Sequence, residues 1–351
     1  MDLRQKISNL IEKEGLEFLG IVPAKSDERA VEAFLKWIAE KKHADMSYLE
    51  RYQDARRDPT RLLPGASSVI VFAWNYYQGD RWADVKRLGT PVVAQYARLA
   101  DYHKLMARKA DAITARLEQE LECGPEVKFR TAIDTLPLLE RNFAARTSMG
   151  FIGKNSMYIH PQKGSFLLLG SLLTTLDLPA DDAAEVDAKA RSRQGGCGTC
   201  QRCQVYCPTG ALSEDFKVDA SRCLAYWTIE NRGVIPEEYW PWLRHYYFGC
   251  DICQLVCPYN KNIKSGAVSP RTFVSLYEVA TMDQKTYETV FGGTSMTRAK
   301  RFGLRRNALI AMTVTRDPKL EDAIDKVQSD SHPVLAETIL QIKNWRSARS
   351  L

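Results

Sequence analysis

Several signatures of common protein classes are missing from the 351 residues of this chain. It has neither the G-x-G-x-x-G turn of dinucleotide-binding folds nor the P-loop lysine motif, so nothing in it supports nicotinamide or nucleotide chemistry. No stretch approaches the roughly 20 consecutive apolar residues that a membrane span needs. The first 20 residues carry charges throughout. We therefore expect no export signal or twin-arginine leader, and a cytoplasmic protein without a membrane partner.

The bulk composition is ordinary. Hydrophobic residues make up 45% of the chain and charged residues 26%, which is typical of a soluble globular protein. The length is enough for two or three domains. A formal net charge of +6 permits an anionic partner but does not require one.

Cysteine is unevenly distributed, because eight of the nine stand between residues 197 and 257. The first four follow the spacing C-x-x-C-x-x-C-x-x-x-C-P, which bacterial-type ferredoxins use to bind iron–sulfur clusters. A second run, C-x-x-C-x-x-x-C-P, lacks its first cysteine, and Cys223 between the runs supplies one. In two-cluster domains the fourth cysteine of each run ligates the other 4Fe-4S cluster. The prediction is one cluster on Cys197, Cys200, Cys203 and Cys257, and a second on Cys207, Cys223, Cys250 and Cys253.

Two other uses of these cysteines are less favoured. A structural zinc site closes with four ligands and does not need a four-cysteine run that ends in Cys-Pro. Disulfides are disfavoured because no secretory segment precedes the run, and C-x-x-C pairs in cytosolic chains more often bind metal. Iron–sulfur ligation is therefore the favoured interpretation.

The pattern of apolar residues predicts strands and helices in alternation before the cysteines, hence an α/β or α+β core. Helices are expected over residues 2–14, 27–40, 102–122 and 136–147, and strands over 68–77, 91–98, 127–133 and 166–176. The run 68–77 is apolar at nearly every position and predicts a strand that is buried on both faces. The predicted domains are a core at 1–178, a linker at 179–196, a cluster domain at 197–262 and a helical tail at 263–351. Two antiparallel helices in the tail suggest a HEAT-like pair, the second beginning at Pro333.

Four segments together resemble the epoxyqueuosine reductases. They are AIDTLPLLERNFAARTSMGFIGKNSMYI at 132–159, the first cysteine run, SRCLAYWTIE at 221–230 and CDICQLVCPYNK at 250–261. The resemblance implies an α+β protein with a nitroreductase-like core, related to corrinoid reductive dehalogenases. It further implies that cobalamin and two 4Fe-4S clusters serve to reduce epoxyqueuosine to queuosine at the wobble position of tRNA, the last step of queuosine biosynthesis.

Asp134 is the expected proton donor, because it matches the general acid in the family's motif. Taken without the resemblance, an aspartate before Thr135 and Pro137 is typical of a helix N-cap. A carboxyl that donates a proton near pH 7 needs a raised pKa, which burial provides. The apolar neighbours Ile133 and Leu136 lead us to expect such burial.

Cofactor and nucleic-acid contacts are also predicted. The resemblance places the corrin against the loop 154–160, where the glycines at 150 and 153 permit close approach, and against Arg57 and Ala97. The predicted cobalamin-binding residues are Arg57, Ala97, Asp134, Asn155, Tyr158, Ile159 and His160. The family carries its cobalt without a protein histidine, so His160 is not proposed as an axial ligand. Basic residues near position 300 are candidates for tRNA phosphate contacts, although charge runs are commonly solvated faces; these are Arg298, Lys300, Arg301, Arg305 and Arg306.

Two alternatives remain open at this point. One is a corrinoid reductive dehalogenase that acts on a small halogenated molecule, and the other is a ferredoxin-type module that only transfers electrons. The leading prediction is a monomeric tRNA-modifying oxidoreductase that receives electrons from a separate donor. The two clusters account for the one-electron transfers, but the sequence does not identify the donor.

Overall fold

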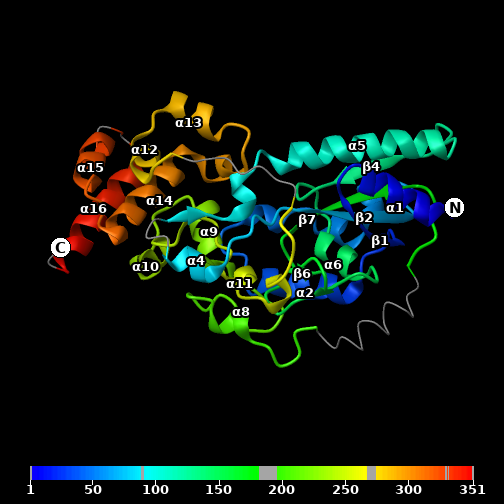
Figure 1. Ribbon diagram of the computed structural model, residues 1–351, viewed down its shortest axis with the longest axis horizontal. Helices are drawn as coiled ribbons and strands as arrows, with labels where there is room; N and C mark the ends of the chain where they lie inside the picture. Colours follow the sequence, from blue (N-terminus) through cyan, green and yellow to red (C-terminus); the bar gives the residue numbers. More distant parts are fainter. Residues whose placement is uncertain are drawn as a thin grey trace.

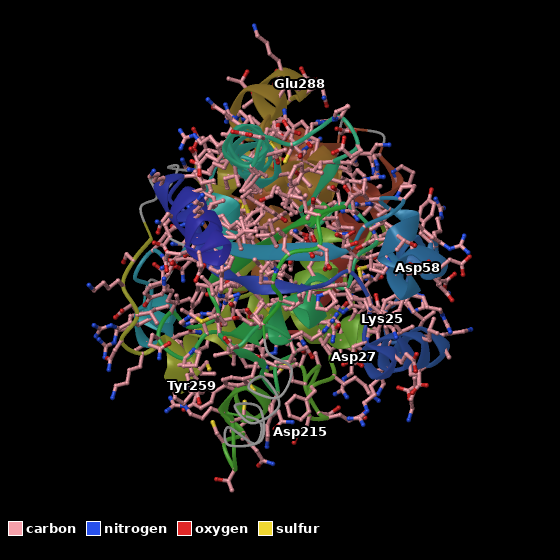
Figure 2. The ribbon with its side chains drawn as sticks, turned by 90° about the vertical axis from the view of Figure 1, so that its right-hand side faces the viewer. Lys25, Asp27, Asp58, Asp215, Tyr259 and Glu288 are labelled. Atoms are coloured by element: carbon pink, nitrogen blue, oxygen red, sulfur yellow. The ribbon has the colours of Figure 1, made fainter. Side chains whose placement is uncertain are left out.

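The computed structural model describes residues 2–87, 91–181, 196–266, 274–328, 330 and 332–349. A sheet with its covering helices lies at one end of the long axis, and a group of C-terminal helices lies at the other (Figure 1). The cysteine-rich segment lies between them, toward the lower edge of this view. In the perpendicular view, Asp215 and Tyr259 of this segment lie at the lower edge and Glu288 of the C-terminal helices lies at the upper edge (Figure 2).

A four-stranded antiparallel sheet in the order β1-β2-β7-β4 forms the centre of the N-terminal part. Its strands are β1 Glu17–Pro23, β2 Ser68–Asn75, β4 Phe129–Ala132 and β7 Leu167–Thr174. The two central strands pair along their whole length, from Ser68 opposite Thr174 to Asn75 opposite Leu167. Strand β2 is buried at every position from Ser68 to Ala73, so the prediction of a strand buried on both faces is confirmed.

Helices cover both faces of this sheet. Ile70 and Phe72 of β2 face α1 (Leu3–Lys13) and α5 (Tyr102–Glu120). Val69 and Val71, on alternate positions of the same strand, face α6 (Glu140–Ala145). Side chains of a strand alternate between its faces, so each apolar residue of β2 contributes to one of the two cores.

The expected elements of the N-terminal part mostly form, with three differences, the first being that the helix expected over 136–147 is present only as the shorter α6, Glu140–Ala145. Helices at 2–14, 27–40 and 102–122 are present as α1, α2 (Glu28–Ala39) and α5, and the strands at 127–133 and 166–176 are present as β4 and β7. The segment 91–98 is a two-residue strand, β3 (Val92–Val93), followed by a turn of 3-10 helix, η3 (Gln95–Arg98), so the longer strand predicted there is wrong. Strand β1 was missed from the sequence.

Strand β3 connects the N-terminal part to the cysteine-rich segment. It pairs in parallel with β8 (Tyr246–Phe248) rather than with the central sheet. Val93 and Ala97 accordingly pack in one hydrophobic core with Trp240 and Phe248. A segment within residues 1–178 thus contributes to the core of the later domains. The expected linker at 179–196 lies largely outside the described residues.

The cysteine-rich segment contains short elements separated by turns. They are α8 Arg202–Val205, η4 Ala220–Arg222, α9 Leu224–Ile229, η5 Glu237–Tyr239, α10 Trp240–Leu243, β8, α11 Ile252–Leu255 and η6 Pro258–Asn260. The helices after the cysteines are α12 Leu276–Thr281, α13 Gln284–Phe291, α14 Lys300–Thr315, α15 Leu320–Gln328 and α16 Pro333–Ser347. Helix α14 is buried at every position from Gly303 to Thr313 and packs against α12, α15, α16 and α10. Helix α16 begins at Pro333, as predicted.

The remaining elements are short. They are η1 Ser47–Leu49, α3 Gln53–Arg57, η2 Pro59–Arg61, α4 Trp82–Arg87, β5 Phe151–Ile152, β6 Tyr158–Ile159 and η7 Ser295–Ala299. Strands β5 and β6 form a small antiparallel hairpin. Among the described helices, none has the length and apolar character that crossing a bilayer requires.

Candidate active site

Asp134 lies just beyond the end of β4, at the start of the loop that leads to α6. Its backbone has a φ of +57°, in the left-handed region that aspartate tolerates better than most residues. A tight turn from the Thr135 amide to the Ile133 carbonyl, at 2.5 Å, follows directly. The Asp134 side chain is 65% exposed. It is therefore accessible to a substrate and not enclosed among its apolar neighbours, so the expected burial is wrong.

Two residues from the first turn of α5 hold the Asp134 carboxylate. The Tyr102 hydroxyl donates to Oδ2 at 2.8 Å, and Nε2 of His103 lies 3.3 Å from the same oxygen. The other ring nitrogen of His103 lies 2.8 Å from Asp101, the N-cap residue of α5. An imidazole between two carboxylates is thus fixed in orientation on both sides.

This arrangement sets the protonation of the pair. Hydrogen bonding from His103, supported by Tyr102, holds the pKa of Asp134 below its ordinary value, although partial desolvation acts in the opposite direction. The same contact with Asp134 raises the pKa of His103 above its ordinary value. The raised carboxyl pKa expected from the sequence is therefore wrong for the free protein. Asp134 is therefore ionised near neutral pH, and its charge favours the protonated form of His103.

A second carboxyl group binds the backbone of Asp134. The Asp134 amide donates to both oxygens of Glu140, at 3.0 and 3.2 Å. Glu140 is the first residue of α6. Burial raises its pKa to about 8, helped by the charge of Asp134 and opposed by the amide hydrogen bond.

Residues from three parts of the chain surround the space in front of Asp134. Burial raises the pKa of Tyr48 from η1, and the charges of Glu230 and Asp134 raise it further. The Arg298 guanidinium lies 4.9 Å from the centre of the Tyr48 ring and pairs with Glu230 at 2.8 Å. Burial raises the pKa of Tyr96, and the charges of Asp134 and Glu230 raise it further. Asp134 therefore faces a space bounded by the N-terminal part, α9 and η7.

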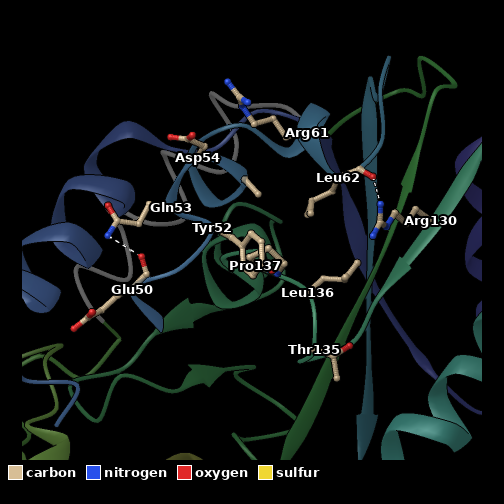
Figure 3. Close-up of a pocket in the computed structure, with 11 residues that line it drawn as sticks. Glu50, Tyr52, Gln53, Asp54, Arg61, Leu62, Arg130, Thr135, Leu136 and Pro137 are labelled. Carbon is tan, nitrogen blue, oxygen red and sulfur yellow. Dashed lines mark hydrogen bonds between the residues drawn. The ribbon is translucent and has the colours of Figure 1, made fainter. Parts of the chain in front are cut away.

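A large open cavity with a volume of about 780 Å³ is bordered by Thr135, Leu136 and Pro137, which follow Asp134 in the same loop. Leu62, Leu136 and Pro137 give it an apolar wall, and α3 and η2 supply polar groups at the rim (Figure 3). Its lining residues are Glu50, Tyr52, Gln53, Asp54, Ala55, Arg61, Leu62, Arg130, Thr135, Leu136 and Pro137. Arg130 from β4 reaches across to the Leu62 carbonyl. Small-molecule sites commonly have this size and this mixture of apolar walls and few polar groups.

The predicted cobalamin-binding residues occupy different environments. Arg57 is exposed at the end of α3, whose first residues line the large cavity. Ala97 is fully buried in η3. Tyr158, Ile159 and His160 are buried as well, so their side chains point into the protein.

The loop before β6 contacts the cysteines directly. The Lys154 amide donates to the Cys197 sulfur at 3.4 Å. The Asn155 side-chain amide reaches the Cys253 carbonyl at 3.5 Å. This loop therefore lies against residues of both predicted cluster sites.

The eight cysteines lie in two groups. A cavity of about 220 Å³ is lined by Cys197, Cys200, Cys203 and Cys257, together with Lys154, Asn155, Ile159, Gly196, Arg202, Pro258 and Tyr259. Burial raises the pKa of the Cys257 thiol to about 11, and the other three cysteines of this cavity raise it further. Burial likewise raises the pKa of Cys253, with Cys223 and Cys207 as its strongest charged neighbours. Coulomb interactions weaken with distance, so these couplings identify neighbours.

The donor set fits iron–sulfur clusters. Buried thiols are costly to ionise unless a metal offsets the charge, and ligation by a metal deprotonates them. Within the described residues, no three His, Cys, Asp or Glu side chains converge closely enough to hold one metal ion. A zinc site would need four ligands, with thiolate sulfurs about 2.3 Å from the ion. A cube of eight iron and sulfur atoms is larger and accepts thiolates that stand further apart.

The basic residues near position 300 differ in accessibility. Arg306 has no exposed surface and donates to the carbonyls of Asn231, Gly233 and Trp227. Arg305 is 3% exposed and binds Asp330 and the Ala280 carbonyl. The prediction that these two arginines contact tRNA is wrong, because α14 directs them into the protein.

The other three basic residues are more accessible. Arg301 is partly buried and pairs with Asp330 at 3.0 Å. The side chain of Arg298 is half exposed, and Lys300 is exposed. The latter two therefore remain candidates for contact with a nucleic acid.

Sequence reasoning missed Tyr102, His103 and Glu140. Asp101 before Tyr102 and His103 carries the signal of a helix N-cap, but nothing local indicates that the following histidine binds a carboxylate 31 residues away. Glu140 looks like an ordinary first-turn acid of α6. The first turns of α5 and α6 both lie against the end of β4, and this packing brings the three residues to Asp134.

Comparisons with known proteins agree with these motifs. Residues 56–135 match the family described as Epoxyqueuosine reductase QueG, DUF1730, and residues 196–260 match the 4Fe-4S double cluster binding domain. An epoxyqueuosine reductase of Salmonella typhimurium is 34% identical over 365 residues, which cover 100% of this chain and 90% of that protein.

Solved structures of similar fold are epoxyqueuosine reductases. The Streptococcus thermophilus structure matches with a TM-score of 0.83 at 22% identity, over 97% of this chain and 90% of that one. A complex with an epoxyqueuosine-modified tRNA-Tyr stem loop matches with a TM-score of 0.78 at 23% identity, over 95% and 88% of the two chains. A Bacillus subtilis structure, whose aspartate-bearing catalytic loop is swung out of the active site, has a TM-score of 0.76 at 22% identity, over 95% and 88%.

Proposed function

This chain belongs to the epoxyqueuosine reductase family, and we propose that Asp134 delivers a proton when it reduces epoxyqueuosine to queuosine on tRNA. The resemblance seen in the motifs is thereby confirmed, and the protein is an oxidoreductase with a domain of the 4Fe-4S double cluster type. The observation that carries the proposal is the hydrogen-bonded pair of His103 and Asp134 beyond the end of β4.

The balance of the reaction shows what the residues must supply. An epoxide becomes an alkene by gaining two electrons and two protons and losing its oxygen as water. The clusters are one-electron carriers, so each turnover takes two electron transfers. The two protons must reach the epoxide oxygen, and an exposed acid–base group is needed there.

We propose that His103 and Asp134 act together in this proton transfer. Asp134 is the exposed member and touches the substrate oxygen, whereas His103 holds the proton and replaces it on the carboxylate. Asp101 fixes the imidazole by accepting from its other nitrogen. An opening epoxide oxygen becomes far more basic than either group, so the transfer toward the substrate is downhill.

We propose that the cysteines ligate the clusters as their spacing predicts. The first cluster takes Cys197, Cys200, Cys203 and Cys257, and the second takes Cys207, Cys223, Cys250 and Cys253. The shared cavity of the first four and the electrostatic neighbours of Cys253 and Cys257 support this division. The Lys154 amide, which donates to the Cys197 sulfur, would stabilise the ligated thiolate.

Cobalamin is the third cofactor in our proposal. When bound, it supplies a reduced cobalt centre that is a strong nucleophile. None of the residues that we propose to hold it lines the cavity of about 780 Å³, so we place the corrin in the space in front of the Asp134 carboxyl, near Tyr48 and Tyr96. Arg57 would contact the cofactor from α3. The buried residues Ala97, Tyr158, Ile159 and His160 would contribute through the backbone, and Asn155 through the loop that also touches the cysteines.

We propose that the tRNA anticodon approaches over η1 and η7. Unstacked RNA bases bind to aromatic rings and guanidinium planes, and Tyr48 and Arg298 present such a pair near Asp134. Lys300 is exposed and would contact a phosphate. The cytoplasmic location, the monomeric state and a separate electron donor remain part of the proposal, as do the domain boundaries, the nitroreductase-like core and the HEAT-like tail.

The test is anaerobic turnover. The purified protein is loaded with cobalamin, and conversion of epoxyqueuosine in an anticodon stem-loop is measured. Replacement of Asp134 by Asn should lower kcat by roughly 10²- to 10⁴-fold, whereas Asp111→Asn on the exposed face of α5 should leave it unchanged. Normal turnover by Asp134→Asn would refute the assigned role, and failure to retain a corrinoid would refute the cofactor proposal.

A further inference from the structure

Besides the contacts of its side chain with Tyr102 and His103, Asp134 is held through its backbone by one side chain of α6. The amide of Asp134 donates to both carboxyl oxygens of Glu140. The other backbone hydrogen bonds of this loop are local, from Thr135 to Ile133 and from Leu138 to Leu136. These local bonds shape the loop, whereas the Glu140 contact connects the backbone of Asp134 to α6.

The same contact maintains an unusual backbone conformation. Asp134 has a φ of +57°, and non-glycine residues stay in this region only when their surroundings hold them there. In this conformation the amide points toward α6 while the side chain points toward Tyr102 and His103. Rotation of the backbone out of this region would break both sets of contacts together.

We propose that Glu140 is a positioning residue, which holds Asp134 against His103 by binding its backbone amide. This inference rests on the proposed role of Asp134. Glu140 binds the Asp134 amide and acts through Asp134. Its length is essential, because the side chain must reach back from the first residue of α6 to the end of β4.

The surroundings of Glu140 indicate that its charge is dispensable. Its carboxyl faces the charged groups of Asp134, Arg141 and His103, and its burial favours the neutral form. A neutral carboxyl still accepts the amide hydrogen bond through one oxygen. Glutamine has the same reach and one carbonyl oxygen, so it should replace glutamate here. Aspartate keeps the charge but is shorter by one methylene group.

Three substitutions of Glu140 distinguish the effect of side-chain length from the effect of charge. Glu140→Gln should retain kcat, whereas Glu140→Asp and Glu140→Leu should lower kcat by about 10- to 100-fold with KM for the stem-loop nearly unchanged, because misplacement of an acid–base group costs about this much. Glu32→Asp, on the exposed face of α2, is the matched control and should behave as the unmodified protein. If Glu140→Asp retained kcat while Glu140→Gln lost it, the proposal would be overturned.

A second readout does not depend on turnover. The Asp134 amide is itself the donor, so its hydrogen exchange with solvent reports the contact directly. Exchange should be about tenfold faster in Glu140→Asp, in line with one lost hydrogen bond, and unchanged in Glu140→Gln. Equal exchange in all variants would refute the inference.

If Asp134→Asn were fully active while the Glu140 variants showed the expected exchange rates, the proposed role of Asp134 would be wrong and the role of Glu140 in binding its amide would be supported. If Glu140→Leu does not fold, the Asp and Gln variants decide the question.

Discussion

Arg306 provides the sharpest test of how the basic residues of the tail are used. The structure assigns it a role in folding, since its guanidinium has no exposed surface. Its acceptors are three backbone carbonyls from the segment 227–233 and the amide oxygen of Asn307. Burial lowers its pKa to about 9, which leaves it charged at neutral pH. The perturbation is Arg306→Met, which keeps the apolar length of the side chain and removes every donor.

The expected loss of stability comes from the three backbone carbonyls that lose their hydrogen-bond donor in Arg306→Met. Each buried carbonyl without a partner costs about 1–3 kcal/mol, and partial relaxation brings the three together to about 3–5 kcal/mol in the free energy of unfolding. Arg306→Lys restores a charge and one or two hydrogen bonds but not the fork geometry, so its cost should be about half as large. Arg298→Ala removes a half-exposed ion pair with Glu230, and such pairs are worth about 0–1 kcal/mol.

The assay compares unfolding with binding. Urea denaturation followed by circular dichroism gives the free energy of unfolding for each variant, and titration with the anticodon stem-loop gives the affinity. We expect Arg306→Met to lose stability and Arg298→Ala to lose affinity. If Arg306→Met unfolds at the same urea concentration as the unmodified protein but binds the stem-loop more weakly, the assignment of Arg306 to folding is wrong.

Three further predictions concern the site. Turnover should be constant at low and neutral pH and should fall as pH rises through the pKa of His103, which lies above its ordinary value because of Asp134. In His103→Gln this decrease at alkaline pH should disappear, and activity should drop by roughly 10²-fold. An unchanged pH profile in this variant would contradict the paired roles of His103 and Asp134. Cys223→Ser should reduce iron from about eight to about four atoms per chain, whereas Cys123→Ser should keep all of it, as iron analysis will show. Arg298→Ala should weaken stem-loop binding by about tenfold, comparable to the loss of one stacked base, without changing the iron content; equal binding would remove Arg298 from the proposed interface.

Features that depend on nearby residues were predictable from the sequence. The spacing of the cysteines was sufficient to predict the cluster domain, because two or three ligands of a cluster come from one tight turn. The enclosed strand at 68–77 was predictable because its apolar run requires two covered faces. Strand β1 and the order of the sheet were not, because pairing between β2 and β7 depends on contacts a hundred residues apart.

The cluster of basic residues in the sequence predicted tRNA-contacting side chains less reliably than the other patterns predicted their features. The five basic residues near position 300 look alike in the sequence, yet α14 buries Arg305 and Arg306 while Lys300 is exposed. Their exposure differs because neighbouring helices surround α14 on nearly all sides from Gly303 to Thr313. Periodicity detects a helix with one apolar face, but it does not predict buried arginines that bind carbonyl groups.

The pKa of Asp134 was also predicted in the wrong direction because contacts with residues distant in the sequence determine it. Its apolar neighbours in the sequence suggested desolvation, whereas His103 and Tyr102 supply hydrogen bonds that stabilise the ionised form. In the free protein the carboxylate is 65% exposed, so water also favours its charge. A docked anticodon would exclude that water, and loss of solvation raises the pKa of a carboxyl group. Substrate binding would thereby move the proton from His103 toward Asp134 at the moment when an epoxide is present to accept it. In the free protein, by contrast, the two carboxylates on either side of His103, which is 30% exposed, favour a proton on the imidazole.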